Sequence, residues 1–202
     1  PFGVIPNHLW FLSSFISTDV LLVKHFFSPH EAGIYASLST LGKIIFYGAG
    51  PIGAVMFPIV SRRYSLGQSY KKIFFFSIFL TFSISFGILT LYFLFPRLAV
   101  SILYGDKYLE ASSYLPWFGL FMSLFTMGSL FASFFLSKGD TKIAGILLFS
   151  ATLQILGIWF SHESILSVIK VSTLSSFLML ALLLVYFAYG KKFESGVERK
   201  IS

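Results

Sequence analysis

The stretch that decides the fold is residues 73–95, IFFFSIFLTFSISFGILTLYFLF, which contains no charged residue. A helix needs roughly 20 consecutive apolar residues to cross the hydrocarbon core of a bilayer. This stretch is long enough, and similar stretches recur along nearly the whole chain. We therefore expect an all-α integral membrane protein.

The composition excludes a soluble domain. Hydrophobic residues make up 56% of the chain and charged residues 11%, whereas a soluble domain carries about 25% charged residues. The chain therefore has too few charges to cover a surface in water. It has no cysteine, which excludes disulfides and thiolate metal sites.

The apolar pattern predicts about six transmembrane helices joined by short loops, so consecutive helices should pack as antiparallel neighbours. The expected helices are Pro6–Phe27, Ala32–Val60, Ile73–Phe95, Ala111–Leu136, Ile143–Phe160 and Ile165–Tyr189. One loop is longer, residues 96–114, PRLAVSILYGDKYLEASSY. Its apolar residues predict a short helix that lies in the membrane interface.

Lysine and arginine set the orientation. If the helices alternate in direction, one side of the membrane receives Arg62, Arg63, Lys71, Lys72, Lys138, Lys142, Lys191, Lys192, Arg199 and Lys200. The other side receives Lys24, Arg97 and Lys107. Basic loops are typically cytoplasmic, so we expect cytoplasmic N- and C-termini and a multi-pass protein of the inner (plasma) membrane.

The same distribution bears on domains and partners. The net charge of +7 comes from short loops between apolar stretches, so we expect no nucleic-acid partner. We divide the chain into a six-helix transmembrane lobe, residues 1–190, and a basic cytoplasmic tail, residues 191–202. The chain begins at Pro1 rather than Met, so we expect a fragment of a longer protein.

Residues 17–24, STDVLLVK, place Asp19 and Lys24 inside an apolar helix. A charge at the centre of a bilayer costs roughly 2.5–3.5 kcal/mol, so each charge needs a partner or a task. The two residues are five positions apart, which places them roughly 140° apart around a helix. They are therefore badly placed to pair with each other, and Lys24 has the alternative of extending to the interface.

Three helices carry small or polar residues on one face. The sets are Ala36, Ser39, Lys43, Tyr47 and Gly50; Gly119, Ser123, Thr126, Ser133 and Ser137; and Glu163, Ser167, Lys170 and Thr173. The set without a lysine is typical of helix packing. The sets with Lys43 and Lys170 favour a hydrated cavity, because charges within the membrane usually face one. An Asp19–Lys43 ion pair and extension of Lys170 to the interface are the structural alternatives.

Helix Ala32–Val60 contains an expected kink. Pro51 removes a backbone donor, and the neighbouring Gly48, Gly50 and Gly53 weaken the helix. Such breaks occur at transporter hinges, although membrane helices also tolerate them without a function. Gly50, Pro51 and Gly53 are the candidate hinge.

The sequence contains no motif for catalysis. His25, the pair His30 and Glu31, and the pair His162 and Glu163 would all face outward, in spacings that match no strong metal motif. There is no phosphate-binding P-loop and no nucleophile elbow. We expect no catalytic residue, no metal and no cofactor, and a polytopic membrane enzyme of glycan assembly stays as an alternative.

Several short motifs resemble a known family. Residues 18–43, TDVLLVKHFFSPHEAGIYASLSTLGK, and residues 54–63, AVMFPIVSRR, resemble the polysaccharide flippase family of the multidrug/oligosaccharidyl-lipid/polysaccharide exporter superfamily. The matching features are Asp19, Gly33 with Tyr35, and Phe57-Pro58 with Ser61. The loop with Gly105 and Tyr108, and the turn SKGDTK at 137–142, are similar to later loops of that family.

The resemblance implies a larger architecture and a transport function. Two six-helix lobes form a V around a central cavity, and this chain would be the C-terminal lobe, with the N-terminal lobe missing from the sequence. The family moves lipid-linked oligosaccharides, glycans on polyprenyl pyrophosphate, from the inner to the outer leaflet for cell-surface polysaccharide synthesis. The implied partners are that lipid-linked oligosaccharide, membrane lipid and the missing lobe.

The candidate substrate-binding residues are Lys43, Lys170, Lys24 and Asp19. The lysines would offset the charge of the pyrophosphate in a low dielectric. Asp19 would hold a proton or a cation, or restrain a lysine between turnovers. A small-molecule or multidrug exporter of the same superfamily stays open, although lysines are unfavourable for cationic drugs, and so does a chain that depends on a partner subunit.

Overall fold

The structure, a computed structural model, describes the backbone of residues 18–201 and the side chains of residues 18–189. This part of the chain is all-helical and contains no strand. Residues 18–26 form a helix, and the rest of the predicted helix Pro6–Phe27 lies outside the described residues. The helices that follow are α2 (Pro29–Ser65), α3 (Lys71–Leu94), α4 (Pro96–Tyr104), the 3-10 helix η1 (Gly105–Ser113), α5 (Leu115–Ser137), α6 (Ile143–Phe160) and α7 (Ile165–Ile201).

Five helices of the described part are long and apolar enough to cross a membrane. They are α2, α3, α5, α6 and residues Ile165–Tyr189 of α7. This confirms the all-α membrane architecture and five of the predicted spans. The predicted short helix in the long loop is also confirmed, as α4, and α5 starts at Leu115 because the 3-10 helix η1 occupies residues up to Ser113.

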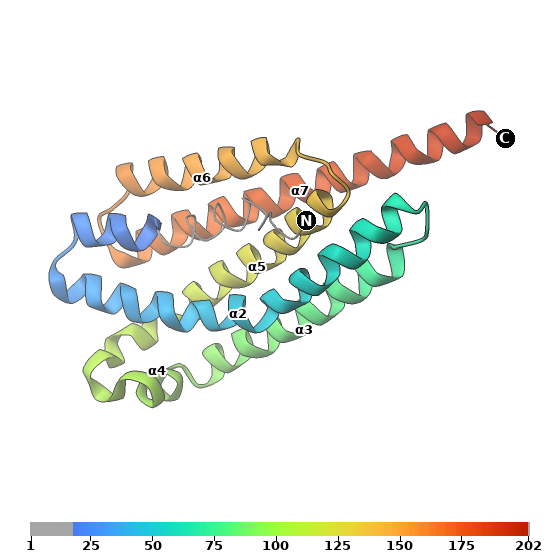
Figure 1. The fold of residues 1–202 in the computed structure, drawn as a ribbon. Coiled ribbons are helices and arrows are strands. Elements are labelled where there is room, and N and C mark those ends of the chain that lie inside the picture. The colour runs from blue at the N-terminus through green and yellow to red at the C-terminus, as the bar shows by residue number, and fades with distance from the viewer. Residues whose placement is uncertain (1–17, 202) are drawn as a thin grey trace, which may run out of the picture.

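Helix α2 is longer than the predicted Ala32–Val60. It begins at Pro29 because Ser28 and Glu31 form a capping box, which satisfies free backbone N–H groups of the first turn. Its 37 residues span roughly 55 Å, which exceeds a hydrocarbon core of about 30 Å. The ribbon of α2 bends in its middle part (Figure 1), and the helix contains Pro51, which removes one backbone hydrogen bond.

Helix α5 is the centre of the bundle. It packs against α2, α3 and α7, while α6 packs mainly on α7 (Figure 1). Glycines allow the closest approaches. A Cβ atom on Gly42 of α2 would lie 2.5 Å from the ring of Phe118 and 2.7 Å from Met122 on α5, and one on Gly128 of α5 would collide with Met179 on α7.

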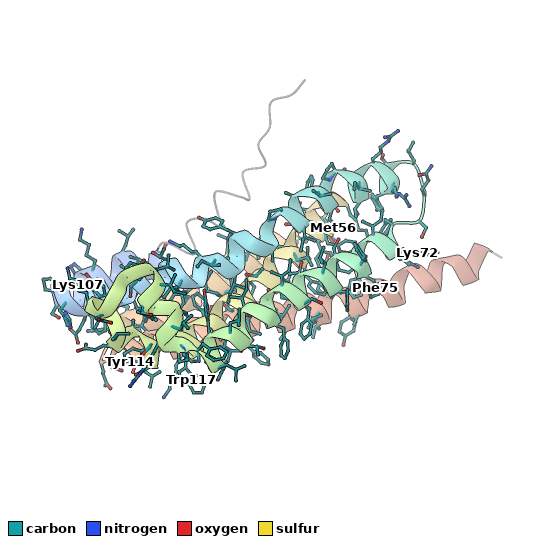
Figure 2. The ribbon with its side chains drawn as sticks, turned by 90° about the horizontal axis from the view of Figure 1, so that it is seen from below. Met56, Lys72, Phe75, Lys107, Tyr114 and Trp117 are labelled. Atoms are coloured by element: carbon teal, nitrogen blue, oxygen red, sulfur yellow. The ribbon has the colours of Figure 1, made fainter. Side chains whose placement is uncertain are left out.

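The bundle has two chemically different ends. The turns between α2 and α3 and between α5 and α6 lie at one end, and α4 and η1 lie at the other (Figure 1). We call the first end the basic end, because it carries Arg62, Arg63, Lys71, Lys72, Lys138 and Lys142. Lys72 and Lys107 mark the two ends in Figure 2.

The last helix extends beyond the predicted span. Helix α7 continues to Ile201, through most of the segment 191–202 that the sequence predicts as a separate tail. The end of an apolar stretch predicts where a helix leaves the membrane. It does not predict where the helix itself ends.

Candidate functional site

Asp19 is buried inside the bundle, with 1% of its surface exposed. The hydroxyl of Tyr35 on α2 donates a hydrogen bond of 2.8 Å to its Oδ2, and the Val20 N–H donates one of 2.8 Å to its Oδ1. The Tyr35 ring packs edge-on against Phe118 of α5, with 5.5 Å between ring centroids. The buried carboxyl that the sequence singles out therefore has a fixed partner, a tyrosine held in place by the central helix.

The polar contacts continue from Tyr35 into two further helices. The Ser172 hydroxyl of α7 lies near the Tyr35 hydroxyl, and Nε2 of Gln154 on α6 donates to Ser172 Oγ at 3.0 Å. Ser172 and Gln154 are both buried. We call these four residues, Asp19, Tyr35, Ser172 and Gln154, the Asp19 network. It joins the helix at residues 18–26 to α2, α6 and α7.

More buried hydroxyls lie on the helices of the network. Ser175 Oγ donates to the Ser150 carbonyl at 2.6 Å, which links α7 to α6. The hydroxyls of Ser39, Ser150 and Ser176 are buried and have no hydrogen-bond partner within the described part of the chain. Ser39 lies one turn from Tyr35 on α2, and Ser176 one turn from Ser172 on α7. A carboxyl, a phenol, an amide and serine hydroxyls can hold a proton or a small cation, and they can hydrogen-bond a polar solute.

Lys43 is half-buried on α2, and its charge acts on Asp19. The two side chains do not form the ion pair considered above. Among the described side chains, one ion pair lies within 4.0 Å, between His30 and Glu110 at 3.3 Å. Tyr35 is the hydrogen-bond partner of Asp19 in place of Lys43, because the phenol reaches the carboxyl from the first turns of α2.

The other two candidate lysines lie apart from the network. Lys24 and Lys170 are exposed on the surface of the bundle. The structure therefore brings Asp19 and Lys43 into electrostatic range, and it leaves Lys24 and Lys170 facing outward from the described residues.

The polar faces differ from those that the sequence indicates. On α5, the hydroxyls of Ser123, Thr126 and Ser137 bond backbone carbonyls three or four residues earlier, which fits the packing interpretation. Of the predicted face at Glu163–Thr173, Glu163 lies before the start of α7 and Lys170 lies on it, and both are exposed. The buried face of α7 carries Ser172, Ser175 and Ser176 instead.

Sequence reasoning missed two members of the network, Ser172 and Gln154, and assigned Tyr35 no polar role. Gln154 had a usable signal, since it is the one amide side chain in the largely apolar helix α6. A polar side chain inside a membrane span is usually buried against other protein groups. Ser172 had no such signal, because α7 also carries other serines at helical spacing.

The candidate hinge lies in open surroundings. A Cβ atom on Gly50 would meet nothing within 4 Å, and one on Gly53 would make ordinary contacts of 3.7 and 3.8 Å with Leu130 and Ser133. The glycines beside Pro51 are therefore not sites of close helix approach, while Ala49 and Met56 on either side of them are buried.

The histidines and their neighbours make separate local contacts. His162 stacks on Phe26, with 4.1 Å between ring centroids, and its Nδ1 lies 2.8 Å from the Trp159 carbonyl. Within the described residues, no three His, Asp or Glu side chains gather where they could hold a metal ion.

Comparison with known proteins places this arrangement in a family. A family model for polysaccharide biosynthesis proteins matches residues 10–113, a range that includes Asp19, Tyr35 and Lys43. No curated protein and no solved structure matches the chain. The family model covers half of the chain. The chain belongs to the polysaccharide biosynthesis protein family.

Proposed function

We propose that this protein moves lipid-linked oligosaccharide, a glycan on polyprenyl pyrophosphate, from the inner to the outer leaflet of the cell membrane. The observation that carries the proposal is the pairing of a buried polar network with family membership. Asp19 is buried and hydrogen-bonded to Tyr35 inside an apolar bundle, and Lys43 is half-buried on α2, in a protein of polysaccharide biosynthesis. Buried charges in membrane spans commonly mark a transport path.

Each charged group has a distinct role in this proposal. Lys43 offsets the negative charge of the pyrophosphate as it crosses the low-dielectric slab. Asp19 holds a proton or cation, and its hydrogen bond from Tyr35 fixes the direction in which the carboxyl points. Lys24 and Lys170 are exposed on the surface of this bundle. In this proposal they contact the pyrophosphate where the transport path runs along that surface.

The proposal includes a second lobe. Helices α2 and α3 and the exposed lysines form surfaces of this bundle that a companion six-helix lobe would cover, with the transport cavity between the lobes. The basic end faces the cytoplasm in this arrangement, in accord with the excess of lysine and arginine there.

A transport assay with matched lysine variants tests the proposal. Full-length protein is reconstituted in proteoliposomes with a fluorescent polyprenyl-pyrophosphate oligosaccharide, and a membrane-impermeant glycosidase reports the amount that reaches the opposite leaflet. The wild-type protein accelerates this transfer over empty liposomes. Lys43→Ala lowers the rate about tenfold, the factor that corresponds to ~1.4 kcal/mol, and Lys43→Arg keeps most of it.

Lys72→Ala serves as the matched control. Lys72 is an exposed lysine at the basic end, and its removal leaves the rate unchanged. A Lys43→Ala protein that expresses normally and transports at the wild-type rate removes Lys43 from the path. A wild-type protein that gives no acceleration refutes the transport function itself.

A further inference from the structure

Phe26, at the end of the helix at residues 18–26, lies among three other rings. The His162 ring stacks on it, with 4.1 Å between ring centroids and 17° between ring planes. The rings of Trp159 and His25 meet it edge-on, with centroid distances of 5.2 Å and 5.0 Å. We call these four residues, His25, Phe26, Trp159 and His162, the Phe26 cluster. It includes the turn between α6 and α7, which lies at the end of the bundle opposite the basic end (Figure 1).

The cluster is the second place at which the helix at residues 18–26 is joined to α6 and α7. The first is the Asp19 network, which includes residues of both helices. Asp19 and Phe26 are seven residues apart, close to two helical turns, so they share one face of the helix. Val23 lies between them on that face and is 1% exposed. The helix therefore packs through one face, and the Phe26 cluster holds the last turn of that face.

His162 follows the end of α6 and satisfies one of its carbonyl groups. Helix α6 ends at Phe160, and the last carbonyl groups of a helix have no donor within the helix. His162 Nδ1 lies 2.8 Å from the Trp159 carbonyl oxygen. Because a carbonyl oxygen can only accept, Nδ1 carries the hydrogen of this bond. The lone pair of the neutral ring is then on Nε2, so the exposed His162 side chain can take a second proton there without losing the bond.

Two neighbours of His162 attract a positive charge on its ring. The carboxyl end of a helix carries partial negative charge, which stabilises a cation beside it. The face of an aromatic ring also attracts a cation, and the His162 ring lies nearly parallel to that of Phe26. A proton on His162 therefore strengthens its contact with the end of α6 and its contact with Phe26. The helix at residues 18–26 is then held more tightly on the α6–α7 turn.

Other charged groups lie near the cluster and must be separated from His162. On the helix at residues 18–26 they are Lys24 and His25, and on the α6–α7 turn the group is Glu163; all three are exposed. None of them forms an ion pair within 4.0 Å among the described side chains. Asp19 is a buried titratable group on the same helix. A pH response of this helix can therefore originate at His162, His25 or Asp19.

We infer that the Phe26 cluster is a pH-sensitive clamp, in which protonation of His162 holds the helix at residues 18–26 on the α6–α7 turn. Histidine ordinarily changes charge between about pH 5 and pH 8. The clamp is therefore tighter toward pH 5 and weaker toward pH 8. Because the basic end is the expected cytoplasmic end, the clamp faces the opposite compartment and responds to the pH there. The inference does not depend on the proposed transport.

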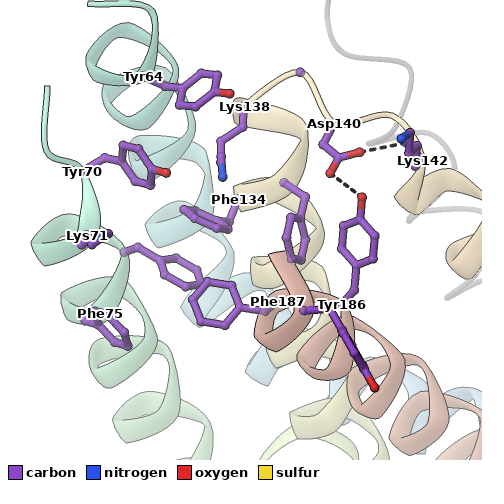
Figure 3. A pocket seen from close by; sticks show the side chains of 14 residues that line it. Tyr64, Tyr70, Lys71, Phe75, Phe134, Lys138, Asp140, Lys142, Tyr186 and Phe187 are labelled. Atoms are coloured by element: carbon purple, nitrogen blue, oxygen red, sulfur yellow. Dashed lines mark hydrogen bonds between the residues drawn. The ribbon is translucent and has the colours of Figure 1, made fainter. Parts of the chain in front are cut away.

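The basic end is held by contacts of another kind. The Tyr186 hydroxyl of α7 donates a hydrogen bond of 2.7 Å to Asp140, in the turn between α5 and α6 (Figure 3). Phe74 and Phe134 stack nearby, with 3.7 Å between ring centroids. These two contacts contain no histidine, the side chain that ordinarily titrates in this range. We therefore assign the pH response to the Phe26 cluster and not to these contacts.

The reaction rate of a buried thiol measures how often the clamp opens. The sequence contains no cysteine, so one introduced cysteine is the reacting group in a background without other cysteines. Val23→Cys places the thiol at the buried position, and Leu21→Cys places it at a position of the same helix that is 66% exposed. The full-length protein in detergent reacts with a maleimide at about pH 5.5 and about pH 8, within the range where histidine titrates. The rate for Val23→Cys divided by that for Leu21→Cys reports opening, corrected for the pH dependence of thiol chemistry.

We expect this rate ratio to be about threefold lower at the acidic pH, the factor that corresponds to one cation–π contact at an exposed site. His162→Phe keeps a ring on Phe26 but cannot take a proton, so the rate ratio loses its pH dependence. His162→Gln also loses the ring, so the rate ratio rises at both pH values and no longer changes between them. A response that originates at Asp19 would persist in both variants.

His30→Gln and His25→Gln are the matched controls. His30 is an exposed histidine outside the cluster, and its Nε2 lies 3.3 Å from Glu110. His25 belongs to the cluster but meets Phe26 edge-on. Both variants should keep the threefold pH dependence of the rate ratio, because each retains His162 stacked on Phe26.

Three results overturn the inference. The first is an equal rate ratio at both pH values with His162 intact. The second is a pH dependence that persists in His162→Phe, which assigns the response to another group. The third is loss of the pH dependence in His30→Gln or His25→Gln. Because the assay measures no transport, each of these results leaves the flipping proposal standing, and failure of flipping leaves the clamp standing.

Discussion

The two parts of α2 on either side of Pro51 differ sharply in how they are packed. Of the buried residues of α2, nine lie between Ile34 and Ala49, and two, Met56 and Val60, follow Pro51. The first part carries Tyr35 of the Asp19 network and presses Gly42 against α5. The second part has Gly53 in ordinary surroundings, and Gly50, directly before Pro51, has open space around it. We call the part before Pro51, which holds the network, the rigid half, and the part after it, which has fewer buried residues, the loose half.

The largest loss of stability should come from adding one methyl group at Gly42, in the rigid half of α2. Gly42→Ala places a Cβ atom 2.5 Å from the buried ring of Phe118, so helices α2 and α5 must separate. We expect a loss of about 3 kcal/mol, at the upper end of overpacking effects, measured as a lower Tm in detergent. Gly50→Ala is the control at an open position directly before Pro51, since its Cβ meets nothing within 4 Å, and equal Tm losses for both variants would show that the contact of Gly42 with α5 is not the cause.

The second effect tests whether the network stabilises the rigid half. Tyr35→Phe removes the hydroxyl that donates to the buried Asp19 carboxyl. A lost hydrogen bond to a charged group corresponds to about 1.5 kcal/mol of unfolding free energy. The double variant Tyr35→Phe/Asp19→Asn should lose less than the sum of the two single variants, because the residues act on each other. Strict additivity in this cycle would show that the contact contributes nothing.

The third effect should appear in transport more than in stability. Pro51→Ala restores a backbone N–H and straightens the middle of α2. If the loose half changes its angle during transport, the rate in proteoliposomes falls about fivefold, equivalent to ~1 kcal/mol on the barrier, while Tm stays level or rises. A Pro51→Ala protein that transports as fast as wild type assigns no role in motion to the bend.

The smallest change in stability should come from a substitution on the exposed surface of the loose half of α2. Val55 is 61% exposed, so Val55→Ala removes little packing. We expect a change in unfolding free energy within about 0.5 kcal/mol. Ile45→Ala, at a fully buried position of the rigid half, gives the reference value, roughly 2–5 kcal/mol. A large loss from Val55→Ala would mean that this surface is covered by another part of the protein.

The sequence predicts the membrane helices well because hydropathy reports them directly. The expected Ile143–Phe160 is also the observed range of α6, and α3 ends one residue before the expected Phe95. The misplaced ends have local causes. The start of α2 depends on the capping box of Ser28 and Glu31, and the end of α7 lies beyond the apolar residues that predict it.

The site was harder to predict because spacing alone does not choose a face. Serine and threonine recur along α7 at steps of three and four residues, and more than one row fits a helical stripe. Only the packing of α7 against α5 and α6 buries Ser172, Ser175 and Ser176. Asp19 was found from sequence because a single acid in an apolar stretch is costly wherever it points.

The bend at Pro51 makes the rest of α2 a lever. The 14 residues from Ile52 to Ser65 extend roughly 21 Å, so a rotation of about 10° at the proline moves the far end by about 4 Å. That end carries Tyr64, whose ring centroid lies 5.4 Å from Lys138 Nζ. A displacement of this size, if directed away from Lys138, takes the ring out of cation–π range, about 6 Å. Opening of the bend would therefore change the contact between Tyr64 and Lys138, so the angle of α2 in its middle would be coupled to the packing of the turns at the basic end.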